Sequence, residues 1–407
     1  MRAGSYEVGS PTLLPGGECL RQPARGAQKL LDPADAARLP GQQLGGLAPA
    51  GAQFRGEGGP RPTISLAEDT LQSDRQQDRT WRGITLLPGR GGCRLADAPM
   101  HPPYLWWSGQ RVPWDEAHIH VTQLGWPALT AVFEGIRAYQ SRDGTKTSLF
   151  RFDRHIARFR RSLRFMQLES AWDEAALLWA ATDLVQANEA IRDAYVMPVA
   201  YGEGGSRGVM TMALGPANIY ITTRLAPSKL PDPPALRVAV SSWTRLNDNI
   251  MPPRIKAFVN YLNSRLGQTE AARAGYDSTL FLNTAGKVAE GGGSCLFLIS
   301  DGVAVTPPVT AGILESVTRE SVMELLRAEL GIRVVEREVD RTELYFADEM
   351  FFTGTMIEIA PIRSVDGFEV PGGAAGPITQ RLMTLFERVV RGEEPRYRHW
   401  LSPIAAR

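Results

Sequence analysis

A stretch with four prolines in eleven positions, residues 225–235, most strongly constrains the fold of this chain. Proline fixes its own backbone and cannot donate a hydrogen bond to a neighbouring strand, so this stretch cannot lie inside a helix or a sheet. Patterns typical of strands and helices alternate on both sides of it. We therefore predict an α/β protein in which the stretch is a stiff linker between two domains, with a ligand in the cleft between them.

Before the linker, residues 101–224 are predicted to form the smaller domain. Apolar or alternating runs predict strands, and two stretches with helical spacing predict helices, the second of which begins after the capping residue Asp173. The predicted strands are 131–140, 194–201 and 217–223, and the predicted helices are 153–166 and 174–187.

After the linker, residues 236–395 are predicted to form a larger domain with the same alternation, followed by a tail at 396–407. Gly275 and Gly331 end two of the predicted helices. The predicted strands are 236–243, 278–283, 294–300, 303–306, 333–339 and 349–353, and the predicted helices are 259–274, 317–330 and 378–390.

The first hundred residues differ in composition from the rest. Glycine and proline account for 26 of them, a share at which segments tend to stay unfolded, and their apolar residues follow neither a helical nor a strand period. We interpret residues 1–100 as a disordered extension, or as sequence upstream of a true start at Met100. A transit peptide ranks third, because acidic residues are mixed among the arginines.

Charge and hydropathy exclude several classes of function. The formal net charge of +1 gives no electrostatic footprint for nucleic acid or for acidic membranes. No apolar run approaches the roughly 20 residues that span a bilayer, and the first residues lack the apolar core of a secretory signal. The spacings of Cys19, Cys93 and Cys295 match no metal site. We expect a cytoplasmic protein with no metal, nucleic-acid or membrane partner.

Lysine is rare in this chain, and only five of its 45 basic residues are lysines. Lys256 alone lies in apolar and aromatic sequence, whereas the others follow turns or lie in regions rich in glycine and proline. Lysine, unlike arginine, can become a neutral amine that attacks a carbonyl. Lys256 is therefore a candidate Schiff-base residue. The alternative is a partly buried lysine whose amine reaches water.

Tyr261 and Glu290 carry groups that suit the ring of a cofactor held by this lysine. Tyr261 lies five positions after Lys256, across the start of a predicted helix, where its phenol could hydrogen-bond a ring oxygen. Glu290 precedes three glycines, which let the backbone approach a flat ring while the carboxylate keeps a pyridine nitrogen protonated. The alternative for Tyr261 is a core aromatic residue, and the alternative for Glu290 is an ordinary hairpin corner.

Two hydroxyl-bearing turns and one arginine suit a phosphate group. The run Glu315-Ser316-Val317-Thr318-Arg319 opens a predicted helix, whose first amides can bind an anion. The turn Thr353-Gly354-Thr355 follows an apolar strand, and Arg151 can bind phosphate through two parallel hydrogen bonds. Each turn alone is more often an ordinary cap, and Arg151 stands out only in combination with the other motifs.

Several motifs, in this order and at this spacing, resemble those of class IV pyridoxal-phosphate (PLP) aminotransferases, most closely the branched-chain amino acid aminotransferases. The resemblance extends from about Tyr104 to Gly367. Its principal motifs are Val132-Phe133-Glu134-Gly135-Ile136-Arg137-Ala138-Tyr139, Lys256 with Asn260-Tyr261-Leu262-Asn263-Ser264, Val288-Ala289-Glu290-Gly291, Val317-Thr318-Arg319 and Thr353-Gly354-Thr355. The resemblance implies PLP fold type IV, with the cofactor between a smaller N-terminal and a larger C-terminal α/β domain. It also implies a homodimer or larger homo-oligomer, because a loop of one subunit completes the neighbour's site.

The resemblance further implies roles for residues at matching positions. Lys256 is then the catalytic residue that holds PLP as a Schiff base, Glu290 contacts the pyridine nitrogen and Tyr261 contacts the ring hydroxyl. The implied phosphate cup consists of Arg151, Val317, Thr318 and Thr355. The implied substrate-side residues are Phe133, Tyr195, Met197, Thr355 and Met356.

The implied reaction moves an amino group between a branched-chain L-amino acid and a 2-oxo acid such as 2-oxoglutarate, in two half-reactions. Lys256 must be a neutral amine to move the proton between the substrate Cα and the cofactor. We expect the cationic cofactor and partial burial to lower the pKa of Lys256, which favours this form.

The sequence departs from the family on the substrate side. The altered positions are Ala128, Leu129, Met197, Phe258, Val259, Cys295 and Ser316. Met197 replaces an arginine that holds the distal carboxylate of glutamate, and an unpaired carboxylate would lower the discrimination in favour of glutamate. Arg207, in the following loop, is one candidate replacement.

Three alternative functions therefore remain. The chain could be a lyase resembling aminodeoxychorismate lyase, a transaminase of D-amino acids or amines, or a degenerate paralogue that only binds ligands. The Phe-Glu-Gly-Ile-Arg-Ala-Tyr strand favours the branched-chain group over the first two. The joint retention of Lys256, Tyr261 and Glu290 argues against the third.

Overall fold

A computed structural model of the chain describes residues 101–121, 129–188, 192–202 and 215–404, all of which belong to one compact unit, Gly92–Arg407. The predicted extension at 1–100, Ala128 and Arg207 lie outside the described residues. Within the described ranges, no helix is long and apolar enough to cross a membrane.

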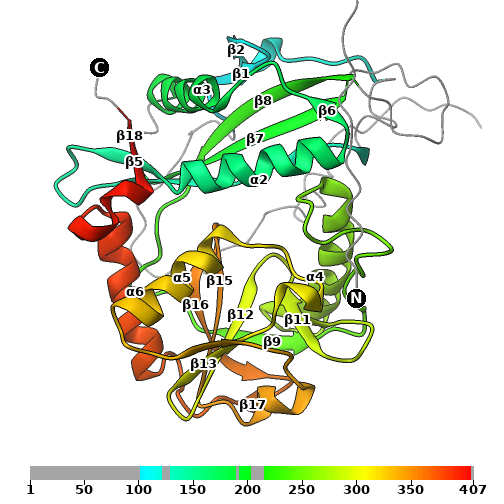
Figure 1. The fold of residues 1–407 in the computed structure, drawn as a ribbon, viewed down its shortest axis with the longest axis vertical. Coiled ribbons are helices and arrows are strands. Elements are labelled where there is room, and N and C mark those ends of the chain that lie inside the picture. The colour runs from blue at the N-terminus through cyan, green and yellow to red at the C-terminus, as the bar shows by residue number, and fades with distance from the viewer. Residues whose placement is uncertain (1–100, 122–128, 189–191, 203–214, 405–407) are drawn as a thin grey trace, which may run out of the picture. The chain divides into compact units, whose positions relative to one another are not determined.

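The first of two mixed sheets contains nine strands within the described ranges, and its main path is β18-β5-β4-β7-β8-β1-β2 (Figure 1). β3 pairs with β7, and β6 pairs with β8. The bounds are β1 Tyr104–Trp107, β2 Gln110–Pro113, β3 Val132–Phe133, β4 Ile136–Gln140, β5 Thr147–Phe150, β6 Leu168–Glu169, β7 Ala194–Gly202, β8 Gly215–Leu225 and β18 Leu401–Ile404. The region predicted as a tail thus contains a strand, because β18 pairs with β5.

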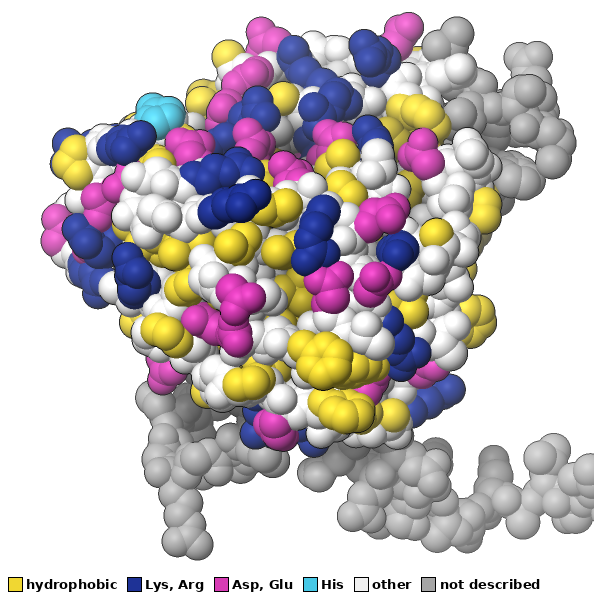
Figure 2. All heavy atoms as spheres, turned by 60° about the horizontal axis from the view of Figure 1, so that its bottom comes forward, with side chains coloured by type: hydrophobic (Ala, Val, Ile, Leu, Met, Phe, Trp, Pro, Cys, Tyr) yellow, Lys and Arg dark blue, Asp and Glu magenta, His cyan; other side chains and the backbone are white. Residues whose placement is uncertain are grey.

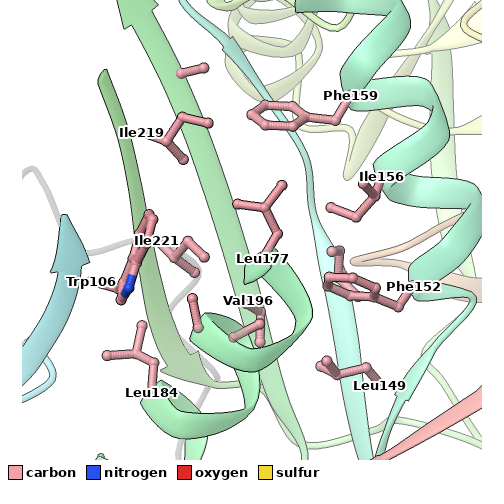
Figure 3. Packing of buried hydrophobic residues seen from close by; sticks show 14 of the residues in the cluster. Trp106, Leu149, Phe152, Ile156, Phe159, Leu177, Leu184, Val196, Ile219 and Ile221 are labelled. Carbon is pink, nitrogen blue, oxygen red and sulfur yellow. The ribbon is translucent and has the colours of Figure 1, made fainter. Parts of the chain in front are cut away.

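Two helices, α2 Phe152–Phe165 and α3 Glu174–Ala187, pack their apolar side chains against this sheet. Phe152, Ile156 and Phe159 recur at helical spacing along α2 and point toward the strands (Figure 3). The Asp173 side chain accepts a hydrogen bond from the Ala176 amide at 2.8 Å, which confirms the predicted cap of α3. The first sheet therefore buries one of its faces beneath these two helices.

The second sheet also contains nine strands within the described part of the chain, in the order β11-β10-β9-β16-β15-β12-β13-β14, with β17 paired to β16. Its strands are β9 Leu236–Val240, β10 Ser278–Leu282, β11 Val288–Gly291, β12 Cys295–Ser300, β13 Val303–Thr306, β14 Val334–Glu336, β15 Glu349–Gly354, β16 Glu358–Val365 and β17 Phe368–Glu369. The remaining α-helices of the described ranges are α4 Tyr261–Arg273, α5 Val317–Ala328 and α6 Pro377–Val390. The 3-10 helices of these ranges are η1 Trp114–Glu116, η3 Phe258–Asn260, η4 Val309–Ala311, η5 Arg341–Tyr345 and η6 Pro395–Trp400.

Strand β12 shows how the second sheet is buried on both faces. Phe297 packs in the cluster that includes α5 and α6, whereas Leu296 and Leu298 pack in a second cluster on the opposite face. Successive side chains of a strand point to opposite faces, so a strand covered on both sides is continuously apolar rather than alternating. This explains why the pattern at 294–300 reads as an uninterrupted apolar run.

The predicted α/β class is confirmed, and most predicted elements occur within a few residues of their expected bounds. One difference lies at 131–140, where a single strand was predicted and two short ones, β3 and β4, are found. The break comes at Glu134 and Gly135. The Glu134 carboxylate is turned to Arg158, and a Cβ at Gly135 would come 1.9 Å from the Tyr195 hydroxyl. The predicted strand at 236–243 also ends earlier, at Val240.

Glu358 connects both sheets to the proline-rich stretch. Its carboxylate, only 2% exposed, accepts hydrogen bonds from the Tyr139 hydroxyl at 3.0 Å, the Ser228 hydroxyl at 2.8 Å and the Lys229 amide at 3.0 Å. Arg137 lies 3.5 Å from the same carboxylate. One buried carboxylate therefore accepts hydrogen bonds from a hydroxyl of β4 and from two donors of the stretch that joins β8 to β9. The division into domains at 101–224, 225–235 and 236–395 remains a prediction.

We predict that Glu358→Ala lowers the free energy of unfolding by about 3 kcal/mol or more, because it leaves Arg137 as an unpaired buried cation. Urea titration followed by circular dichroism measures this loss. Glu369→Ala, at an exposed position of β17, is the matched control and should change stability by less than about 0.5 kcal/mol. Equal, small losses in both variants would contradict the prediction.

Candidate active site

A cavity of about 230 Å³ is lined by residues of both sheets, of the segment before α4 and of the segment before α5. It brings together most of the residues that the sequence singled out. Those that line it are Phe133, Tyr195, Lys256, Tyr261, Glu290, Thr355 and Met356. The predicted site residues that are not among its lining residues are Arg151, Met197, Val317 and Thr318.

The segment that carries Lys256 is docked against β3. The Phe133 amide donates to the Lys256 carbonyl at 3.0 Å, and the Phe258 amide donates to the Ala131 carbonyl at 3.1 Å. The Asn260 side-chain amide donates to the carbonyls of Pro252 and Ile255, both at 2.9 Å. These contacts fix the backbone on both sides of Lys256, so its side chain enters the cavity from a defined point.

The amine of Lys256 lies among aromatic groups. Its Nζ is 2.6 Å from the Tyr261 hydroxyl and 4.7 Å from the centroid of the Phe133 ring. Burial lowers the pKa of Lys256, but the adjacent Tyr261, together with Glu134 and Tyr195, raises it by more, so the pKa lies above its ordinary value. Burial alone therefore does not lower the pKa of Lys256 in this chain, and the lowering expected from the cationic cofactor together with burial stays a prediction.

The Glu290 carboxylate is buried at another wall of the cavity and is held by several donors. Arg245 Nη2 lies 2.5 Å from one carboxylate oxygen, and the other accepts from the Leu314 amide at 3.2 Å and lies 3.8 Å from Cys295 Sγ. Burial raises the pKa of Glu290, although Arg245 opposes this rise. Burial and the Glu290 charge raise the pKa of the Cys295 thiol to about 12. The carboxylate is thus fixed in position, and the thiol stays protonated.

The glycines after Glu290 have a steric role. A Cβ on Gly291 would lie 2.6 Å from the Ser294 hydroxyl and 3.0 Å from the Phe352 ring. At Gly291, only glycine fits without moving these two side chains. The predicted approach of this glycine backbone to a flat ring stays a prediction.

The cavity also has a cationic end near the start of α5. Ser316 lines it and caps the helix, its hydroxyl accepting from the Arg319 amide at 3.3 Å. Arg158, from α2, donates through Nη1 to the Glu315 carbonyl at 2.6 Å. The amides that open a helix carry partial positive charge. This end of the cavity therefore suits an anion, and Val317 and Thr318 supply the first amides of the helix.

Arg158 belongs to a buried cluster of charged groups. Its Nε and Nη2 donate to the two oxygens of Glu134 at 2.7 and 2.8 Å, and His155 Nδ1 lies 2.8 Å from the same carboxylate. Glu134 is fully buried. Burial raises the pKa of Glu134, but Arg158 and His155 lower it by more, so the group is ionised at neutral pH. A guanidinium has more N–H groups than these contacts use, so Arg158 can also donate into the cavity.

Arg151 lies elsewhere. It is the residue before α2, seven positions from Arg158, and its guanidinium lies 4.5 Å over the Trp400 ring and 3.5 Å from Glu320. Seven residues are about two turns of helix, roughly 10 Å along the axis. Arg151 has a left-handed backbone just before α2, so the two arginines reach different surroundings, and Arg158 is the one that lines the cavity.

Similarity to known proteins identifies the family of this chain. The family model for amino-transferase class IV matches residues 131–365. The chain belongs to this family. A probable branched-chain-amino-acid aminotransferase of Aquifex aeolicus is 35% identical over 307 residues, 74% of this chain and 96% of that protein. The structure of the branched-chain amino acid aminotransferase of Thermobaculum terrenum in its PLP form matches with a TM-score of 0.73 at 44% identity, covering 75% of this chain and 99% of that one.

A second solved structure, a branched-chain amino acid aminotransferase from T.th., complexed with N-(5'-phosphopyridoxyl)-L-glutamate, has a TM-score of 0.69 at 33% identity. The match covers 75% of this chain and 99% of that one. The resemblance to class IV aminotransferases, closest to the branched-chain group, is thereby confirmed.

Sequence reasoning did not select Arg158, Arg245 or Glu134 as site residues. A signal for Arg158 was present, because His155, Arg158 and Ser162 form a polar stripe beside the apolar stripe of α2, and all three are buried. Nothing in the sequence marks Arg245, since its partner Glu290 is 45 positions away. In this class IV aminotransferase, buried ion pairs thus surround the cavity.

We predict that Glu134→Gln lowers the free energy of unfolding by about 3 kcal/mol at pH 7, because Arg158 loses its buried counter-ion. The folded-state pKa of Glu134 is lowered, so its contribution is present above the unfolded pKa of about 4.3. It disappears as the pH falls from there toward the folded-state pKa. Urea titrations of both proteins between pH 7 and pH 3 should show the difference narrowing only below about pH 4. A constant difference would contradict the prediction.

Proposed function

We propose that this chain is a PLP-dependent transaminase that moves an amino group between a branched-chain L-amino acid and a 2-oxo acid such as 2-oxoglutarate. The observation that carries the proposal is the meeting of the Lys256 amine, the Tyr261 hydroxyl and the Glu290 carboxylate in one cavity. The names of the relatives support the substrate class, and the solved structures in a PLP form and with a phosphopyridoxyl-glutamate adduct support the cofactor.

The polar groups in the cavity match the chemical groups of this cofactor. Pyridoxal phosphate supplies an aldehyde that condenses with amines and a protonated ring that accepts electron density. Lys256 offers the amine, Glu290 an anion for the ring nitrogen, and Tyr261 a phenol beside the amine. The phosphate fits the end of the cavity that is formed by Arg158, the start of α5 and Thr355.

The chain's own residues then have separate tasks in the reaction. The Lys256 amine removes a proton from the substrate Cα and returns one at the next step, and the hydrogen bond that it donates to the Tyr261 hydroxyl keeps it oriented. The Glu290 carboxylate, fixed by Arg245, holds the proton on the ring nitrogen. The proposed phosphate cup comprises Arg158, the amides of Val317 and Thr318, and Thr355. Arg158 thereby takes the role that the sequence suggested for Arg151.

The substrate side of the cavity is largely apolar. The Phe133 ring stacks on Phe258 with centroids 4.4 Å apart and planes 9° apart, and Tyr195 and Met356 line the same space. An apolar wall next to the reacting amine fits a branched aliphatic side chain better than a polar one. This wall supports leucine, isoleucine and valine as amino donors.

The proposal extends to assembly and location, as a homodimer in the cytoplasm. Large apolar side chains at Leu129, Phe258, Leu262 and Met356 are each more than one-third exposed, as expected for residues that a second subunit covers. The face drawn in Figure 2 shows positive and negative side chains interspersed with exposed apolar ones. Such a mixed surface suits small-molecule substrates rather than a polyanionic partner.

We predict that the PLP-loaded protein converts leucine, isoleucine and valine with 2-oxoglutarate as acceptor, and that Lys256→Ala lowers this rate by roughly 10²–10⁴-fold or more. Borohydride reduction followed by peptide mapping should place a pyridoxyl group on Lys256 of the wild-type protein. Lys287→Ala is the matched control, because Lys287 pairs with Asp340 and does not line the cavity. No turnover of the three amino acids with either 2-oxoglutarate or pyruvate as acceptor would refute the substrate class, and an adduct on another lysine would refute the role of Lys256.

We predict that Arg158→Met weakens PLP binding by roughly 10- to 100-fold, the loss expected for a charge-assisted hydrogen bond to phosphate. Binding of pyridoxal, which has no phosphate, should weaken much less, so the ratio of the two affinities measures the phosphate contact. Arg151→Met, at the residue just before the same helix, is the control and should keep the wild-type ratio. A larger loss of this ratio in Arg151→Met than in Arg158→Met would restore the assignment based on sequence.

A further inference from the structure

The guanidinium groups that line the cavity already have acidic partners. Arg158 is paired with Glu134, and Arg245 is paired with Glu290. Both lie beside the groups proposed to bind the cofactor. A dicarboxylic substrate would bring a second carboxylate into the largely apolar substrate side, and at Met197 the chain has no cation to receive it.

Arg224, on β8, lies at the edge of this substrate side. Its Cζ is 5.0 Å from the centroid of the Tyr195 ring, and its Nη2 donates to Met356 Sδ at 3.5 Å. Tyr195 and Met356 both line the cavity. The side chain is exposed, and among the described residues no carboxylate lies within ion-pair distance of it. Its charge is thus available to a ligand.

The register of the two strands places Arg224 next to Met197. Tyr195 is opposite Arg224, and Met197 is opposite Thr222, across the antiparallel pair of β7 and β8. Residues opposite each other project from the same face, so Arg224 shares a face with Tyr195 and Met197. The diagonal separation from Met197 is about 7–8 Å, within reach of a long side chain. The guanidinium of an arginine at 224 can therefore reach the region that the guanidinium of an arginine at 197 would reach.

We propose that Arg224 is a specificity-determining residue that binds the distal carboxylate of a dicarboxylic amino acid or 2-oxo acid at the substrate side of this cavity. The inference rests on the proposed transaminase function. With a branched-chain substrate, the guanidinium of Arg224 stays on the face of the Tyr195 ring. The aliphatic part of the Arg224 side chain packs there, and its charge remains solvated. With glutamate or 2-oxoglutarate, it turns to the carboxylate and forms two parallel hydrogen bonds. One cavity thereby accepts both apolar and anionic side chains.

The test compares the two half-reactions separately in the PLP-loaded protein. Single-turnover changes in the cofactor's visible absorption give kcat and KM for glutamate alone and for leucine alone. In Arg224→Met, the glutamate-to-leucine ratio of kcat/KM should fall by roughly 10- to 100-fold, mainly through the KM for glutamate. Arg224→Lys should recover part of the ratio, because it keeps the charge but not the planar fork. Arg160→Met, on the exposed face of α2, removes the same charge elsewhere and should keep the wild-type ratio.

Two results would overturn the role of Arg224. One is an equal loss with both donors, and the other is a wild-type protein that reacts with leucine and pyruvate but with neither glutamate nor 2-oxoglutarate. The second result leaves the proposed transaminase intact. A wild-type protein that reacts with no amino donor would overturn the proposed function itself, and the inference with it.

Discussion

The docking of the Lys256 segment onto strand β3 is the interaction on which the rest of the site depends. The hydrogen bond from the Phe133 amide to the Lys256 carbonyl and the bridge between Val132 and Ala257 join a segment that follows β9 to a strand of the first sheet. They set the amine over the Phe133 ring and beside Tyr261. Backbone hydrogen bonds between these segments thus bring together groups from both sheets.

Buried charges around the cavity are arranged in matched pairs. Glu134 pairs with Arg158, and Glu290 pairs with Arg245. A buried ion pair contributes little net stability, but removing one partner leaves an uncompensated charge, so each pair holds its members in one geometry. Rigid placement of donors before a ligand arrives is what a site for charged cofactors and substrates requires. We infer that these pairs serve positioning more than stability.

Local patterns in the sequence predicted most helices and strands, because the spacing of apolar residues within one helix or strand involves only residues a few positions apart along the chain. The helical pattern over 153–166 predicted α2, and the cap at Asp173 predicted the start of α3. The break at Glu134 and Gly135 could not be predicted, because it depends on Arg158 and on the Tyr195 ring, which only the fold brings close. Short edge strands such as β18 were missed for a similar reason, since pairing with β5 defines them.

The sequence by itself determined the chemistry available to this protein: a lysine in an apolar context, a phenol, a carboxylate before glycines, and motifs that identify the family. The tertiary structure decided which charged groups reach the cavity. Arg151 and Arg158 carry the same charged group and lie seven positions apart, yet only Arg158 lines the cavity. The pKa of Lys256 likewise depends on Glu134, which lies between β3 and β4, and on Tyr195 of β7, both far from Lys256 in the sequence. The type of each residue is known from the sequence alone. The strength of an electrostatic interaction depends on the distance between two groups in the folded chain, which only the tertiary structure sets.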